Sequence, residues 1–199
     1  MKAARHFACW ILAVSLAFAF STASAASGQT AKAEASAMSL AFLGVDYQHR
    51  WSKSGQNEFT PQGQSDLNAW HDMMTLNVYD SVGNGEQLAE AANQVLGNYQ
   101  RAGKILRTDS RPRTAERPAE HLIAAVLGSP AFLEAAFARF VMVDGVGVVA
   151  VYSHRVYGKQ AGPAMSEWLK ANGQQVESAL MSWGMLPTPA ALKALPQSH

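Results

Sequence analysis

Two long apolar runs joined by Asp144-Gly145 constrain the fold of this chain more than any other part of the sequence. The runs are Phe132–Val143 and Val146–Tyr157. An Asp-Gly pair between apolar runs favours a two-residue hairpin turn, because both central residues of that turn take positive φ angles. The sequence therefore predicts a long antiparallel β-hairpin over residues 132–157.

The same turn predicts the register of the two strands, because pairs can be counted outwards from it. The predicted cross-strand pairs are Val143 with Val146, Val141 with Val148, Phe137 with Tyr152, Glu134 with Arg155 and Phe132 with Tyr157. Opposite charges facing each other at one of these pairs support the register. The alternative is a helix over residues 130–140, since Phe-Leu-Glu-Ala-Ala-Phe-Ala has good helix propensity.

The first 25 residues have the features of a cleaved secretory signal peptide. Lys2 and Arg5 precede an apolar stretch over residues 7–20, and residues 21–25 end in the small-residue pattern Ala-Ser-Ala. The apolar stretch is too short to span a bilayer comfortably. We expect cleavage after Ala25 and a periplasmic location, with no membrane span in the mature chain; an uncleaved anchor is the alternative.

The composition of the mature chain excludes several classes of site and partner. The only cysteine lies in the leader at Cys9, so the mature chain would have no disulfide, no thiol nucleophile and no cysteine-based zinc site. Of the 16 Lys and Arg residues, loss of Lys2 and Arg5 leaves 14 against 15 Asp and Glu, a net charge of −1. This balance disfavours binding of nucleic acid through overall charge.

The rest of the chain mixes strand-like and helix-like patterns. Apolar residues at one-face helical spacing predict helices over residues 86–102 and 164–183. The other predicted strands cover residues 40–51, 58–60, 73–82, 104–108 and 120–127. We expect an α+β domain over residues 38–186, with one antiparallel sheet of about six or seven strands and an early and a C-terminal helix packed on it. Residues 26–37 are expected to form a flexible linker, and residues 187–199 a proline-containing tail.

This order of elements, with a hairpin first, a helix after the third strand and a helix at the end, resembles the PsbP-like fold. That fold is named for an accessory protein of photosystem II and is shared by small bacterial exported proteins. The resemblance covers residues 38–183 and rests on element order rather than on a sequence motif. It implies an adaptor, assembly or accessory role, and it offers no catalytic motif to map onto this chain.

A cluster of cations stands out in a chain that is otherwise close to neutral. Six Lys and Arg residues lie within residues 101–117, and residues 109–118 are expected to form a loop because they contain two prolines. Guanidinium groups bind carboxylates and phosphates through paired hydrogen bonds, so this loop is a candidate contact surface. The candidate binding residues here are Arg107, Arg111, Arg113 and Arg117. The alternative is a solvated loop whose arginines pair with Asp109, Glu116 and Glu120.

The end of the second hairpin strand is another candidate contact surface, because it turns polar and aromatic after an apolar run. Its candidate binding residues are His154, Arg155 and Tyr157. The two-residue period of a strand places His154 on one face and the other two side chains on the opposite face. The alternative is cross-strand pairing of Arg155 with Glu134. The sequence does not place this surface relative to the basic loop.

The mature sequence has no motif that indicates a metal, cofactor or hydrolase site. It lacks His-x-His, His-Glu-x-x-His and Gly-x-Ser-x-Gly, so no catalytic residue, metal or cofactor is assigned. We expect a non-catalytic binding or accessory protein of the bacterial envelope, with another envelope protein or a small anionic ligand as its partner. The alternative is a small hydrolase-like envelope enzyme with His154 or His121 as base. A buried histidine hydrogen-bonded to a carboxylate would favour that alternative.

Overall fold

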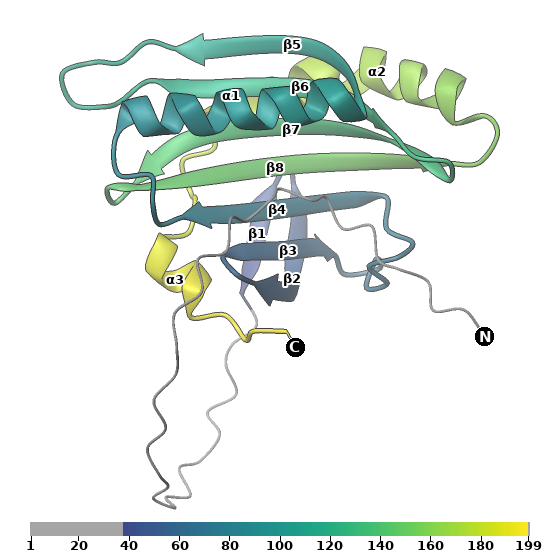
Figure 1. Ribbon diagram of the computed structural model, residues 1–199. Helices are drawn as coiled ribbons and strands as arrows, with labels where there is room; N and C mark the ends of the chain where they lie inside the picture. Colours follow the sequence, from purple (N-terminus) through teal and green to yellow (C-terminus); the bar gives the residue numbers. More distant parts are fainter. Residues whose placement is uncertain (1–37, 199) are drawn as a thin grey trace, which may run out of the picture. The chain divides into compact units, whose positions relative to one another are not determined.

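The computed structural model describes residues 38–198 (Figure 1), so the predicted signal peptide, Cys9 and the predicted linker lie outside the described residues. The described chain forms one antiparallel sheet of eight strands in the order β1-β2-β3-β4-β8-β7-β6-β5, with three helices. The strands are β1 (Ser39–Phe42), β2 (Val45–Lys53), β3 (Gln56–Pro61), β4 (Asp72–Tyr79), β5 (Gly103–Arg111), β6 (Glu120–Gly128), β7 (Phe132–Val143) and β8 (Val146–Tyr157). The helices are α1 (Gly85–Ala102), α2 (Ala161–Ser182) and α3 (Pro189–Lys193).

The predicted hairpin is confirmed as β7 and β8, and all five predicted cross-strand pairs are present in its register. Asp144 and Gly145 both have positive φ, 49° and 77°, as the predicted turn requires. The alternative helix over residues 130–140 is wrong, because these residues from Phe132 onward pair with β8. The hairpin lies in the middle of the sheet, since β8 also pairs with β4 and β7 with β6.

The sheet has one strand more than the upper limit of the prediction, because residues 40–51 form two strands rather than one. Leu43 and Gly44 make a tight turn with φ angles of 50° and 77°, and Phe42 pairs with Val45 across it. Leucine is a poor residue for a positive φ, which Asn, Asp or Gly adopts more readily. Gly44 was therefore the only signal of the turn in the sequence, next to a leucine that disfavours it.

Helices α1 and α2 cover opposite faces of the sheet (Figure 1), and each buries its own cluster of apolar side chains. The predicted stripe of α1, including Leu88, Val95 and Tyr99, is buried against strands β5 to β7. Helix α2 packs on β6, β7 and β8 with Met165, Leu180 and other side chains. The α+β class is thus as predicted, with a core on both sides of the sheet.

The packed region continues past residue 186, where the sequence indicated that the domain ends. Thr188 accepts a hydrogen bond from the backbone N–H of Ala191 at the start of α3. Leu192 and Leu195 are buried in the cluster that also holds α2. Among residues 38–198, no helix is both long and apolar enough to cross a membrane.

Candidate functional site

The basic cluster lies at one edge of the sheet, on β5 and the loop that joins it to β6; we call residues 103–119 the basic hairpin. Strand β5 continues to Arg111, which pairs with Glu120, so the expectation of a loop from residue 109 is corrected. Pairing with β6 extends the strand as far as the residue before Pro112, whose lack of an N–H ends it. Arg107 and Arg111 are therefore strand residues, whereas Arg113 and Arg117 lie on the loop.

The two strand arginines of the basic hairpin are already paired with acids. Arg107 lies 2.7 Å from Asp109 and 3.4 Å from Glu177 of α2. Arg111 lies at a longer distance, 3.8 Å, from Glu120. Both arginine side chains remain about half exposed, so these pairs are solvated and contribute little stability.

The two loop arginines, Arg113 and Arg117, are exposed, and neither has an ion pair within 4 Å among residues 38–198. Glu116, a partner suggested by the sequence, instead accepts a hydrogen bond from the Thr114 hydroxyl at 2.8 Å. That hydrogen bond holds the pKa of Glu116 below its usual value. Within the described part of the chain, the two guanidinium groups at the end of the basic hairpin thus have no ion pair within 4 Å.

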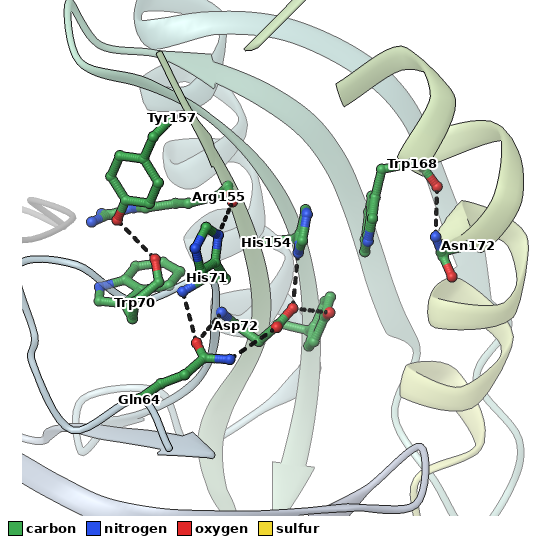
Figure 2. Close-up of polar contacts among 10 residues, drawn as sticks. Gln64, Trp70, His71, Asp72, His154, Arg155, Tyr157, Trp168 and Asn172 are labelled. Atoms are coloured by element: carbon green, nitrogen blue, oxygen red, sulfur yellow. Dashed lines mark hydrogen bonds and ion pairs between the residues drawn. The ribbon is translucent and has the colours of Figure 1, made fainter. Parts of the chain in front are cut away.

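The second candidate surface, at the end of β8, is centred on His154 (Figure 2). Its Nδ1 lies 2.8 Å from Oδ1 of Asp72, the residue opposite it on β4. The Tyr152 hydroxyl donates to the same oxygen at 2.8 Å. The ring of Trp168 on α2 stacks on His154, with centroids 4.1 Å apart and planes within 4°. The imidazole is therefore fixed by a carboxylate on one side and an indole on the other.

The carboxyl group of Asp72 is held in its charged form by its donors. Partial burial raises its pKa, but hydrogen bonds from His154, Tyr152 and Gln64 outweigh burial, and the pKa lies below its usual value. Burial and the nearby Asp72 charge together raise the pKa of Tyr152. Tyr152 is thus a neutral donor to a charged carboxylate. The other nitrogen of His154, Nε2, has no hydrogen-bond partner within residues 38–198.

Arg155 points to the opposite side of β8 from His154 (Figure 2), and its side chain is buried. Its Nε donates to Glu134 at 2.7 Å, the cross-strand pair that the hairpin register predicted. Its guanidinium group lies between the rings of Trp70 and Phe132, 3.8 and 4.0 Å from their centroids. These contacts favour the alternative for Arg155, which is cross-strand pairing with Glu134. They also hold the loop before β4 against the sheet, through Trp70.

Tyr157 also fixes that loop. Its hydroxyl donates to the backbone carbonyl of Trp70 at 2.7 Å, and its ring packs edge-on against His71 and Phe132. His71 in turn has Nδ1 3.1 Å from the backbone oxygen of Arg155. Of the three candidates at the end of β8, His154 is the one with a ring nitrogen, Nε2, that makes no hydrogen bond to the described residues.

The structure does not bring the two candidate surfaces together. Along β7, Glu134 faces Arg155, and Phe140 faces His121, which is next to Glu120 at the base of the loop. Those two positions on β7 are six residues apart, about 20 Å of strand at roughly 3.3 Å per residue. The free arginines and His154 therefore belong to separate sites.

The sequence singled out His154 but missed its two partners. Asp72 and Trp168 reach it from β4 and α2, and the pairing of β4 with β8 joins segments far apart in the chain. No sequence signal gives this pairing. Among the described residues, no group of three His, Cys, Asp or Glu side chains is arranged to hold a metal ion.

No protein-family model matches the sequence, PsbP-like or other, and no curated protein matches it. Comparison with solved structures finds the crystal structure of the Saccharomyces cerevisiae Ran-binding protein Mog1p, at a TM-score of 0.44 and 12% sequence identity. The match covers 73% of this chain and 92% of that chain. It is a distant similarity of fold.

Proposed function

We propose that this chain is an exported, non-catalytic binding protein of the bacterial envelope, and that its basic hairpin contacts an acidic surface of a partner protein. The observation that carries the proposal is that Arg113 and Arg117, at the end of the hairpin, are exposed and have no ion pair with any of residues 38–198. Guanidinium groups that are free and solvent-exposed can pair with carboxylates of another molecule without breaking existing contacts.

The spacing of the cations favours a protein partner over a small anion. The basic residues extend from Lys104 on β5 to Arg117 on the loop, and they lie along an exposed sheet edge. A small phosphate or carboxylate would be bound by groups that converge on one point. An acidic protein surface can meet cations that are spread along a strand and a loop.

The test is capture of partners from an envelope extract by the purified protein without its leader, beside the variant Arg113→Ala/Arg117→Ala. The matched control is Lys159→Ala/Lys170→Ala, which removes two exposed charges elsewhere. We expect a partner that is retained by the wild type and the control and lost by the arginine variant. Retention of the same proteins by all three would contradict the role of the hairpin, and binding of inorganic phosphate alone would favour a small anionic ligand.

The export part of the proposal rests on residues 1–25, and it has its own test. We expect the chain isolated from the periplasmic fraction to begin at Ala26 when its N-terminus is determined by mass spectrometry. Recovery of the intact chain from Met1 in the membrane fraction would instead favour the uncleaved anchor.

A second candidate function, a small hydrolase-like enzyme, is favoured by one observation. Asp72 and His154 form a hydrogen-bonded pair, and Nε2 of the imidazole has no hydrogen-bond partner in the described part of the chain. In such an arrangement a carboxylate orients a histidine base. No Ser or Thr hydroxyl of the described chain hydrogen-bonds His154, so an attacking group would have to be water or substrate.

The enzyme candidate is tested by turnover of p-nitrophenyl acetate and p-nitrophenyl phosphate. If His154 is a general base, His154→Gln should lower the rate at least about 100-fold, and Asp72→Asn should lower it as well. Rates that are equal in wild type and both variants would exclude this role of the pair for these substrates and leave the binding function as the better supported one.

A further inference from the structure

The two edges of the sheet differ in what they offer to another molecule. One edge is β1, which has only four residues, two of them buried. The other edge is β5, which has nine residues, and all but Ile105 are exposed. An edge strand has backbone N–H and C=O groups on its outer side that can pair with an added strand. Strand β5 is therefore the edge with room for such pairing.

The side chains of β5 disfavour pairing with a second copy of the same strand. Its charged residues are Lys104, Arg107, Asp109 and Arg111. Two copies side by side would place three cations of each strand next to those of the other, with one acid on each strand to offset them. Like charges on neighbouring strands repel, so self-association at this edge is disfavoured. The same charges favour an added strand that carries carboxylates.

The register between β5 and β6 shifts between Ile105 and Arg107. The part of β5 that suits a regular added strand begins after this shift. From Arg107 to Arg111 the pairing with β6 is continuous. Arg107 and Arg111 lie on one face of this segment, on the side of α2, because they reach Glu177 and Glu120. A partner strand with acidic residues at alternate positions would place its carboxylates beside these two arginines on that face.

We propose that β5 accepts an extended acidic segment of the partner protein as a ninth strand of the sheet. This inference rests on the proposed binding function of the basic hairpin and specifies how the partner binds. Backbone hydrogen bonds to β5 supply the alignment, and the arginines of β5 and of the loop select carboxylates. The weak solvated pairs of Arg107 and Arg111 do not oppose this exchange of partners.

The probe is the synthetic peptide acetyl-(Thr-Glu)₄-amide, with acetyl-(Thr-Gln)₄-amide as the charge control. Two further peptides carry the acidic sequence with N-methyl groups, one at the Thr positions and the other at the Glu positions. In an added strand, alternate N–H groups point toward β5 and away from it. N-methylation therefore blocks pairing in one of these peptides and leaves it intact in the other.

Binding is measured by titration of the ¹⁵N-labelled protein, together with hydrogen exchange of the β5 amides. We expect the acidic peptide to bind and to slow exchange in β5, and the neutral peptide to bind weakly. One N-methylated peptide should bind at least tenfold more weakly than the other. Equal binding of both N-methylated peptides would overturn strand addition, because a contact through charge alone does not distinguish them.

The failure of this inference and of the proposed function can be told apart. If envelope partners are captured in a way that depends on Arg113 and Arg117 but the acidic peptide neither binds nor protects β5, strand addition is wrong and the binding function stands. If no captured partner depends on Arg113 and Arg117, and the acidic peptide neither binds nor protects β5, both are wrong.

Discussion

Nε and Nη2 of Arg139 both lie 2.9 Å from the same carboxylate oxygen of Glu120, in a pair that is buried between β7 and β6. Nη1 of the same arginine donates to the carbonyl oxygens of Leu180 and Trp183, at 2.9 and 2.7 Å. These carbonyls belong to the C-terminal end of α2, where the helix dipole favours a cation. One side chain therefore joins the sheet to the end of the helix.

We expect Arg139→Met to be strongly destabilising. It removes the charge that neutralises Glu120 and leaves buried carbonyl oxygens without their donor, and loss of one partner of a buried pair costs about 3 kcal/mol or more. For a chain of this size that corresponds to a fall in Tm of roughly 10 °C. Thermal unfolding followed by circular dichroism measures it, with the exposed substitution Arg113→Ala as control. Equal Tm values for the two variants would contradict the role of Arg139.

The parts of this fold that the sequence predicted are those in which the signal is local. The β7–β8 register follows from the two turn residues Asp144 and Gly145, and the pair of Glu134 with Arg155 follows from counting. The β1–β2 turn was missed because Leu43 adopts a backbone conformation that its residue type disfavours. Gly44 was the only local signal of that turn.

The candidate site was only partly predictable for a different reason. Strand periodicity placed His154 and Arg155 on opposite faces, and the structure agrees. The partners of His154 come from β4 and α2, and its contact with Asp72 depends on β4 pairing with β8 across more than 80 residues of chain. That choice of neighbour is made by the packing of the whole sheet, which no short stretch encodes.

The charged state of Asp72 implies that the stability of the fold depends on pH in the acidic range. Burial raises the pKa of Asp72, but the hydrogen bonds from His154 and Tyr152 have the larger effect and lower it. The pKa in the folded state therefore lies below the pKa in the unfolded state. As the pH falls, the unfolded chain takes up this proton first, and stability is lost below about pH 4. We expect urea unfolding to show wild type more stable than Asp72→Asn above this range, with the difference shrinking as the pH falls through it.

The matched control for this titration is Asp66→Asn, which replaces an exposed aspartate in the loop between β3 and β4. The free energy of unfolding of this control should differ little from that of the wild type across the same pH range. A constant difference between wild type and Asp72→Asn from pH 6 to pH 2 would show that the Asp72 carboxyl does not titrate differently in the folded and unfolded chain.

The buried pair of Glu134 and Arg155 should show strong coupling in a double-mutant cycle. Glu134→Leu alone leaves the guanidinium group without its carboxylate, at a cost of about 3 kcal/mol. Adding Arg155→Met removes the uncompensated charge and keeps an unbranched side chain between Trp70 and Phe132. We expect the double variant to be more stable than Glu134→Leu, measured by urea unfolding. Additive effects of the two substitutions would contradict a coupled pair.

The same double variant tests whether Arg155 contacts a partner. Because its side chain is buried and paired, we expect envelope partners to be captured as by wild type once the variant is shown to be folded. Loss of a partner from the folded double variant, with Arg113 and Arg117 intact, would move the contact surface from the basic hairpin to the end of β8.

Gly103, the first residue of β5, lies close to the backbone of β6. A Cβ at this position would overlap the carbonyl oxygen of Val126 and lie 2.8 Å from Cα of Leu127. Since those atoms belong to a paired strand, they cannot move aside without disturbing the β5–β6 ladder. We expect Gly103→Ala to lower the free energy of unfolding by about 2 kcal/mol, in the range found for overpacked interiors, as measured by urea unfolding.

The control is Gly162→Ala in the first turn of α2, where a Cβ would meet no atom within 4 Å. Alanine is the better helix former, so this variant should be neutral or more stable by up to roughly 1 kcal/mol. Hydrogen exchange then shows the cause of any loss of stability in Gly103→Ala. Faster exchange confined to β5 and β6 would show that the hydrogen bonds between these two strands are weakened. Uniformly faster exchange with an unchanged β5–β6 pattern would contradict a local clash.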